Sequence, residues 1–213
     1  MNQQEQLDNT RIFMTNFHKN DYSGHDIAHI NRVERLALYI AEQEQPVNTF
    51  IINMASLLHD TVDSKLTNNA EATNKLRTFL SSIQINNNDS EAILHIINNM
   101  SYSHAKVHHT ALSKEGQIVR DADRLDALGA IGIARTFQFA GAYDEPMWRD
   151  EIDYASLTNG NYSVANLSPS AIKHFYEKLF NLKELMHTET AYAIAKKRHE
   201  FMQQFVHQFF EEW

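Results

Sequence analysis

The chain has 213 residues, a net charge of −8, 43% hydrophobic residues and no cysteine. This length suits a single domain, and the lack of cysteine excludes disulfides and thiolate metal sites. The acidic charge argues against a nonspecific nucleic-acid-binding protein, which needs a basic surface to neutralise phosphates. The acidic charge does not exclude a small phosphate-bearing substrate, because a metal and a few basic side chains can hold the phosphate.

Hydrophobic residues recur with helical periodicity in nearly every long segment, and only 3 Pro and 6 Gly interrupt the chain. The sequence therefore predicts an all-α protein, a single-domain helical bundle with one core. The predicted helices cover residues 25–44, 48–60, 68–84, 90–100, 115–140, 168–186 (with Ser168 as its cap) and a last segment that carries Phe201, Phe205 and Phe209.

The three phenylalanines of the last segment recur every four residues, so they share one helical face. We expect that face to lie in the core, with a homodimer interface as the alternative. The first 13 residues lack the basic-then-apolar pattern of a signal peptide, and no stretch approaches about 18 apolar residues. We therefore expect no membrane partner and a cytoplasmic location.

The first candidate motif is "SGHDIAHINRVERLA", residues 23–37. His25 and His29 are four residues apart, so a helix would place both on one face, with Arg32 nearly on the same side. "HDIAH" has the spacing of the H-E-x-x-H zinc-peptidase motif, with Asp26 in place of Glu. That comparison is weak because Asp is shorter than Glu and no third His follows. The structural alternative is that His25 caps the helix.

The second motif is "ASLLHDTVDSK", residues 55–65, where an apolar run leads into His59 and Asp60. Sequential residues diverge by about 100° around a helix, but at a helix end both can reach one ion. A buried carboxylate is costly unless it is paired or bound to a metal. The pair indicates either two metal ligands or a solvated helix end.

The third motif is "IVRDADRLDALGAIGIA", residues 118–134, where Asp121, Asp123 and Asp126 interrupt an apolar segment. Asp121 and Asp123 lie about 160° apart on a helix, so a site on one face takes only one of them. Arg124 could pair with a neighbouring carboxylate or bind a phosphate through two hydrogen bonds. The alternative is an ordinary charged surface stripe.

No single motif decides the function. Together they offer His, then His-Asp, then Asp on three separate segments. This mixed nitrogen and oxygen set suits Mn²⁺, Fe²⁺, Mg²⁺ or Zn²⁺ with positions left for water and substrate.

The order of these motifs, with "EGQIVRDADRLDALGAIGIAR" at residues 115–135, resembles the HD-domain metal-dependent phosphohydrolases. It is most similar to small stand-alone bacterial members, including ones that cleave nucleoside triphosphates. The resemblance covers residues 20–140 well and the C-terminal helices, about 168–213, in general character. It implies one HD domain over residues 1–213, with the metal site in the first of these parts.

The resemblance implies four metal ligands, His29, His59, Asp60 and Asp123, with Asp121 as the fallback for the last. The implied cofactor is one divalent ion, for which Mn²⁺, Mg²⁺, Fe²⁺, Ni²⁺ and Zn²⁺ are all candidates. Relatives with two metals carry additional histidines between the HD pair and the final Asp. Four histidines lie there in this chain, His95 within a predicted helix and His104, His108 and His109 in a segment expected to be a polar loop. Because stand-alone relatives commonly vary in that loop, we expect one metal.

The resemblance also implies roles around the metal. Asp63, three residues after Asp60, corresponds to a proposed water-activating group, and the alternatives are Asp126 or the metal alone. The positions expected to contact the substrate phosphates are His25, Arg32, Lys65 and Arg124.

The implied activity is hydrolysis of a (deoxy)nucleoside triphosphate to a monophosphate and pyrophosphate. The alternatives are a nucleotidase, a cyclic-nucleotide or other phosphoester hydrolase of the same superfamily, or a noncatalytic metal- or nucleotide-binding regulator. We expect a small-molecule phosphate substrate and no nucleic acid polymer as partner.

Overall fold

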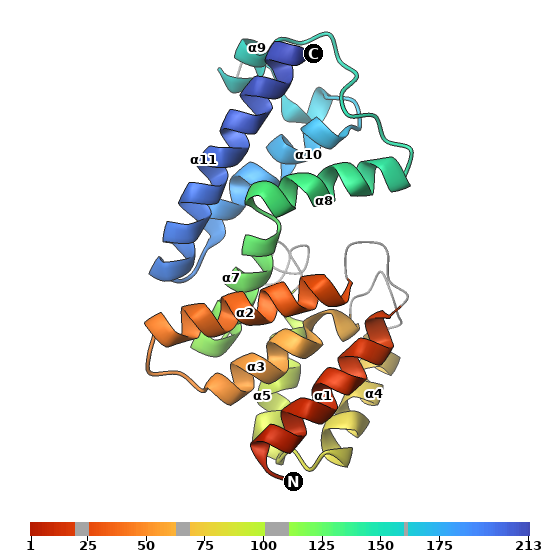
Figure 1. The fold of residues 1–213 in the computed structure, drawn as a ribbon, viewed down its shortest axis with the longest axis vertical. Coiled ribbons are helices and arrows are strands. Elements are labelled where there is room, and N and C mark those ends of the chain that lie inside the picture. The colour runs from red at the N-terminus through yellow and green to blue at the C-terminus, as the bar shows by residue number, and fades with distance from the viewer. Residues whose placement is uncertain (20–25, 63–68, 101–110, 160–161) are drawn as a thin grey trace. The chain divides into compact units, whose positions relative to one another are not determined.

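The computed structural model describes residues 1–19, 26–62, 69–100, 111–159 and 162–213, and every regular element in these ranges is a helix (Figure 1). The predicted all-α class is confirmed. None of the helices in these ranges is long and apolar enough to cross a membrane. The residues group by their contacts into two compact units, unit 1 (Met1–Asp123) and unit 2 (Arg124–Trp213). The predicted domain limits stay a prediction.

Unit 1 is built around α3 (Thr49–Leu58), which packs against three neighbouring helices (Figure 1). Most side chains of α3 from Ile51 onwards are buried, as expected for a helix that is apolar on nearly all sides. Its last turn runs directly into the 3-10 helix η1 (His59–Val62), so a core helix delivers the His-Asp pair. The other helices of unit 1 are α1 (Gln3–His18), α2 (Ile27–Gln43), α4 (Asn69–Ser82), α5 (Asn87–Asn98) and most of α7 (Lys114–Asp126).

The helix predicted over residues 25–44 begins at Ile27, because Asp26 is its N-cap. The Asp26 carboxylate accepts a hydrogen bond from the backbone N–H of His29 at 2.7 Å. A carboxylate that caps a helix in this way is not placed like the general base of a zinc-peptidase motif. The structure therefore argues against the peptidase interpretation of "HDIAH".

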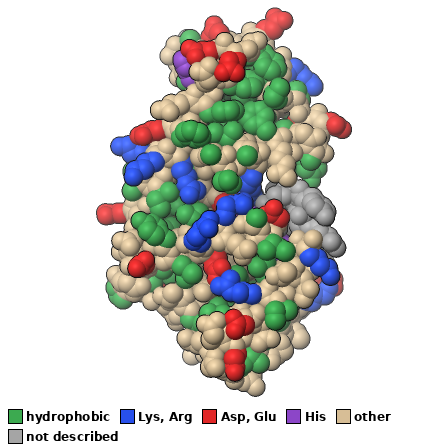
Figure 2. All heavy atoms as spheres, viewed as in Figure 1, with side chains coloured by type: hydrophobic (Ala, Val, Ile, Leu, Met, Phe, Trp, Pro, Cys, Tyr) green, Lys and Arg blue, Asp and Glu red, His purple; other side chains and the backbone are tan. Residues whose placement is uncertain are grey.

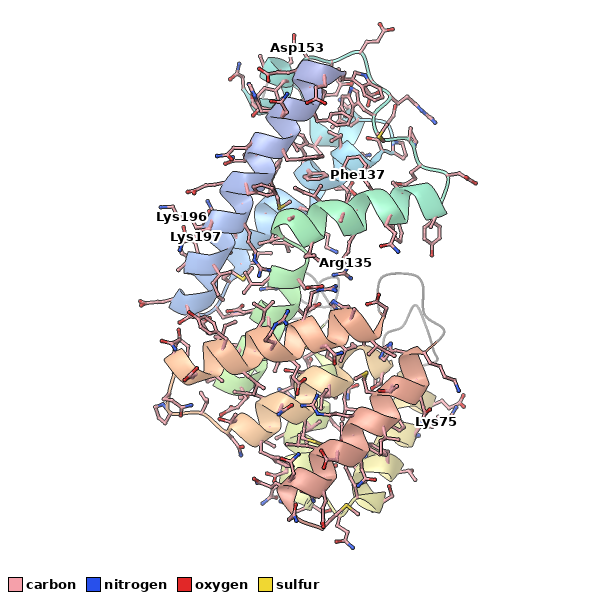
Figure 3. All side chains as sticks on the ribbon, viewed as in Figure 1. Lys75, Arg135, Phe137, Asp153, Lys196 and Lys197 are labelled. Carbon is pink, nitrogen blue, oxygen red and sulfur yellow. The ribbon has the colours of Figure 1, made fainter. Side chains whose placement is uncertain are left out.

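Unit 2 has an aromatic core. The ring of Phe137, on α8, lies 6.3 Å from Phe175, 5.8 Å from Phe205 and 6.2 Å from Phe209 between ring centroids (Figure 3). The core prediction was wrong for Phe201, which is 48% exposed. The helices of unit 2 are α8 (Gly129–Ala142), α9 (Tyr154–Thr158), η2 (Val164–Asn166), α10 (Ala171–Glu177), η3 (Leu179–Leu185) and α11 (Glu189–Glu212).

The single helix predicted over residues 115–140 is two helices. α7 ends at Asp126 and α8 begins at Gly129, whose φ of +76° is a left-handed conformation that glycine adopts without strain. Gly132 approaches the preceding turn so closely that a Cβ there would lie 2.2 Å from the carbonyl oxygen of Ala127. Two glycines therefore make this turn possible.

Two arginines hold the same turn in place. The guanidinium of Arg135 pairs with the Asp126 carboxylate at 2.8 Å, and the Asp126 side chain is only 2% exposed. Arg198, on α11, donates a hydrogen bond to the carbonyl oxygen of Leu125 at 2.5 Å. Burial lowers the pKa of Arg198, and the nearby Asp126 carboxylate opposes that shift.

The helix predicted to start at residue 168 starts at Ala171, and its N-cap is Ser170 rather than Ser168. Ser168 instead donates two hydrogen bonds to the carboxylate of Asp150, at 2.9 Å from its backbone N–H and 2.8 Å from its hydroxyl. A serine that binds a distant carboxylate is not available as a helix cap.

Candidate metal centre

Four side chains of unit 1 bring their donor atoms together where α3 passes into η1. His29 comes from α2, His59 and Asp60 from η1, and Asp123 from α7. The two His Nε2 atoms are 3.3 Å apart. Oδ2 of Asp60 lies 3.3 Å from Nε2 of His29 and 3.4 Å from Nε2 of His59. Oδ1 of Asp123 lies 3.6 Å and 3.8 Å from the same two nitrogens.

These separations fit the coordination shell of a single ion. Donor atoms at about 2.1 Å from an ion lie about 3.0 Å apart at right angles and about 3.4 Å apart in a tetrahedron. The three donor atoms of His29, His59 and Asp123 all lie within 4.8 Å of one another. Two imidazole nitrogens and two carboxylate oxygens form a donor set that suits divalent first-row metals. The residues present therefore fit the divalent ion that the sequence predicts.

The ring of His59 is held in the tautomer that a metal ligand needs. Its Nδ1 lies 2.8 Å from the backbone carbonyl oxygen of Ser56, and because a carbonyl only accepts, Nδ1 carries the hydrogen. In the neutral ring Nε2 then has a free lone pair, and Nε2 is the atom that faces the cluster. The carbonyl is one turn earlier in α3, so the core helix itself orients this ring.

Three of the four converging side chains are buried, and the fourth, Asp123, is partly exposed. His29, His59 and Asp60 are 1%, 5% and 8% exposed. The Asp123 side chain is 37% exposed. An ionised carboxylate as buried as Asp60 is favourable only with a compensating cation or hydrogen bonds, and a divalent ion supplies that charge. Solvent therefore reaches the four side chains at Asp123.

The two aspartates that compete for the last ligand position differ in burial. Asp123 contributes its oxygen to the cluster, whereas Asp121 is 0% exposed and points from another side of α7. This arrangement supports Asp123 over the fallback Asp121.

Of the predicted phosphate-binding residues, two lie in the described ranges. Arg32 is half-buried on α2, three residues after His29. Arg124 is 8% exposed in unit 2, where it donates to the carbonyl oxygen of Leu185 and lies 3.4 Å from Nε2 of His187. Its predicted phosphate contact stays a prediction.

The remaining predicted residues lie outside the described part of the chain. These are His25, Asp63 and Lys65, together with the second-metal candidates His104, His108 and His109. Sequence reasoning did not identify the Ser56 carbonyl or His187. Every residue has a backbone carbonyl, so the sequence does not show which one accepts a hydrogen bond. His187 is 63 residues from its partner Arg124, so no local pattern connects the two.

The HD domain family matches residues 26–128, a range that contains all four side chains of the cluster. The chain is 37% identical over 210 residues to the uncharacterized protein YpgQ of Bacillus subtilis, covering 98% of this chain and 94% of that protein. The crystal structure of B. subtilis YpgQ in complex with ADP is similar with a TM-score of 0.79 at 36% identity, over 100% of this chain and 97% of that one.

A second crystal structure, of an HD-superfamily hydrolase from Bacillus thuringiensis, is similar with a TM-score of 0.77 at 40% identity. It covers 100% of this chain and 98% of that one. The chain therefore belongs to the HD-domain superfamily of hydrolases.

Proposed function

We propose that this protein is a metal-dependent phosphohydrolase that converts (deoxy)nucleoside triphosphates to the monophosphate and pyrophosphate. The observation that carries the proposal is the convergence of His29, His59, Asp60 and Asp123 around one point. The nucleotide part of the proposal is supported by the relative YpgQ, which was crystallised with ADP.

The same four side chains are the proposed ligands of one divalent ion. When bound, such an ion lowers the pKa of a bound water and polarises a phosphoryl oxygen. His59 contributes a ring that the Ser56 carbonyl already orients, so little rearrangement is needed for binding. Asp60 and Asp123 contribute two negative charges, which favour a divalent cation over a monovalent one.

The proposed roles outside the ligand set rest on the family resemblance. Asp63 is the proposed group that orients or deprotonates the attacking water. His25, Arg32, Lys65 and Arg124 stabilise the negative charge on the phosphate oxygens. An acidic protein needs such localised positive charge to bind a polyanion.

A substrate screen tests the activity. The protein is incubated with Mn²⁺ and a panel of nucleoside mono-, di- and triphosphates, and phosphate and pyrophosphate are quantified separately. We expect triphosphates to be consumed with one pyrophosphate released per monophosphate. Release of phosphate alone would indicate a nucleotidase, and no turnover of any nucleotide with Mn²⁺ would favour a noncatalytic regulator.

Metal content tests the ligand assignment. We expect about one ion per chain in the wild type. His59→Ala and Asp60→Ala should lose the ion, whereas His95→Ala, which removes an exposed histidine on α5, should keep it. Unchanged metal content in the first two variants would refute the assignment. Asp63→Ala should keep the metal and lose most of its turnover.

A further inference from the structure

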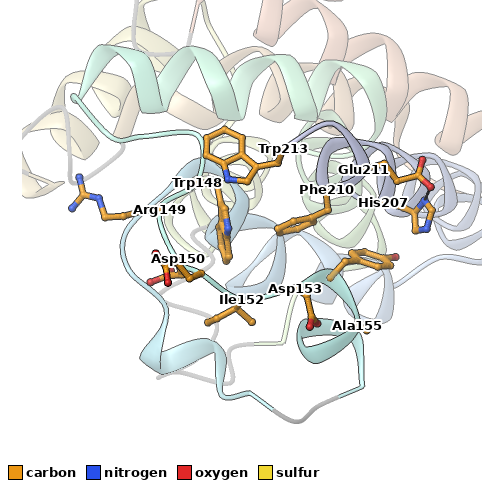
Figure 4. Close-up of a pocket in the computed structure, with 12 residues that line it drawn as sticks. Trp148, Arg149, Asp150, Ile152, Asp153, Ala155, His207, Phe210, Glu211 and Trp213 are labelled. Atoms are coloured by element: carbon orange, nitrogen blue, oxygen red, sulfur yellow. Dashed lines mark ion pairs between the residues drawn. The ribbon is translucent and has the colours of Figure 1, made fainter.

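Unit 2 contains a pocket whose lining residues have no part in the metal centre. The pocket has a volume of about 630 Å³ and lies between residues 148–155 and the C-terminal end of α11 (Figure 4). Volumes of roughly 300–1,000 Å³ are typical of small-molecule sites. The residues of α11 and beyond that line it are His207, Phe210, Glu211 and Trp213.

Aromatic rings form the apolar walls of this pocket. The rings of Trp148 and Phe210 meet edge to face at 5.3 Å between centroids, and Tyr154 lies 5.9 Å from Phe210. Trp148 is 3% exposed and anchors the wall, whereas Trp213 is 62% exposed at the pocket's edge. Aromatic faces carry negative potential, so walls of this kind attract organic cations.

The charged residues of the pocket are mostly acidic. Its lining includes the carboxylates of Asp150, Glu151, Asp153 and Glu211, one guanidinium, that of Arg149, and the imidazole of His207, whose Nδ1 lies 3.8 Å from the Glu211 carboxylate. The Arg149 side chain extends away from the aromatic rings (Figure 4). Acidic side chains also gather on the surface at the end of unit 2 that carries α9 (Figure 2). The pocket is therefore complementary to a cation.

Two of these carboxylates are fixed by hydrogen bonds. Asp150 accepts both hydrogen bonds from Ser168, and Asp153 accepts one from the backbone N–H of Ser156 at 2.6 Å. The Ser156 bond holds the pKa of Asp153 below its usual value, so this group is negative at neutral pH. Each carboxylate has further lone pairs with which to accept hydrogen bonds from a ligand.

We propose that this pocket binds a free small organic cation of the polyamine class, with several ammonium groups joined by aliphatic segments. Carboxylates spread around the pocket match separated ammonium groups, and the aromatic walls match the methylene segments between them. A bare metal ion fits less well, because within the described ranges these carboxylates form no group of converging donor atoms. A nucleotide fits less well because its phosphates would face four carboxylates.

Tryptophan fluorescence gives a direct assay, because the chain has only two tryptophans and both line this pocket. Spermidine, titrated at constant ionic strength, should change the emission saturably, whereas triethylene glycol, an uncharged chain, should not. No saturable change with spermidine up to about ten millimolar would overturn the proposal. If a tri-lysine peptide bound more tightly than spermidine, the proposal of a free polyamine would be wrong, and the pocket would instead bind lysine side chains of another protein.

A pair of matched double variants separates the pocket from the general charge of the protein. Glu151→Gln with Glu211→Gln should weaken spermidine binding by roughly two- to thirty-fold, from the usual strength of exposed ion pairs. Glu189→Gln with Glu200→Gln removes two exposed carboxylates from α11 outside the pocket and should leave the affinity within about twofold. Equal losses in both double variants would overturn the assignment to this pocket.

Discussion

Replacing Gly132 by alanine should destabilise the protein, whereas the same replacement at Gly141 should stabilise it slightly. Both glycines lie in α8, so the change in helix propensity is similar at the two positions. The difference lies in their surroundings. A Cβ on Gly132 would lie 2.2 Å from the carbonyl oxygen and 2.5 Å from the carbonyl carbon of Ala127, whereas a Cβ on Gly141 meets nothing within 4 Å.

The expected cost at Gly132 follows from that distance. Ordinary contacts begin at 3.4 Å, so the backbone on one side must move by about 1 Å. Because neither partner is a flexible side chain, we expect the upper end of the overpacking range, about 3 kcal/mol. For a chain of this length that lowers the Tm by about 6–12 °C. At Gly141 the gain of about 0.5–1 kcal/mol raises the Tm by about 1–4 °C.

Thermal unfolding followed by circular dichroism, with a chelator present to remove metal-linked stability, measures both effects. Far-UV spectra of the two folded variants should match the wild type before heating. A Gly132→Ala variant with a Tm within about 2 °C of the wild type would refute the reasoning, because it would show that the Ala127 carbonyl is not in close contact with residue 132.

Three further predictions concern the metal and pH. Saturating Mn²⁺, at about 100 times its Kd, should raise the wild-type Tm by about 5–11 °C, and Asp60→Asn should lose most of that rise in the same assay. Asp123→Asn should lose the bound ion while Asp121→Asn keeps it, as measured by elemental analysis of the folded proteins, and the reverse result would exchange their roles. Burial, aided by Lys183, lowers the pKa of His199. The unfolded chain therefore takes up a proton that the folded state resists, and stability should fall as the pH drops below about 6.5. Urea unfolding midpoints at about pH 7.5 and about pH 5.5 should differ less in His199→Gln than in the wild type.

The helical class could be predicted from the sequence, and so could the four side chains that converge in the structure; their role as metal ligands stays a prediction. The small number of proline and glycine residues and the 3.6-residue hydrophobic periodicity are local properties, so they can be recognised in the sequence alone. The sequence also predicted that His59 and Asp60 follow the end of an apolar helix. In the structure α3 is buried and η1, which carries both residues, follows it directly. The tightening of that last turn into a 3-10 helix was not predicted, because it depends on packing around the end of α3.

The break between α7 and α8 could not be predicted from local patterns. The apolar residues of 115–140 have helical spacing, and isolated glycines are tolerated in helices at modest cost. The interactions that hold the turn come from elsewhere in the sequence: Arg198 is 73 residues from Leu125, to which it donates. Tertiary contacts of this kind override a local helical pattern.

The turn between α7 and α8 lies within residues 115–135, the segment that resembles the HD family. The carboxylates of this segment lie in different surroundings in the structure. Oδ1 of Asp123 lies 3.6 Å from Nε2 of His29 in the candidate metal centre, whereas Asp126 is 1% exposed and bound to Arg135 at 2.8 Å. A carboxylate that is buried and held by a guanidinium is poorly placed to take a proton from an attacking water. If Asp63→Ala retained its turnover, we would therefore look to the metal-bound water itself rather than to Asp126. Asp126→Asn should then mainly reduce stability, by about 1–3 kcal/mol because the charge-assisted hydrogen bond from the part-buried Arg135 is weakened, and leave the metal content of the folded fraction unchanged.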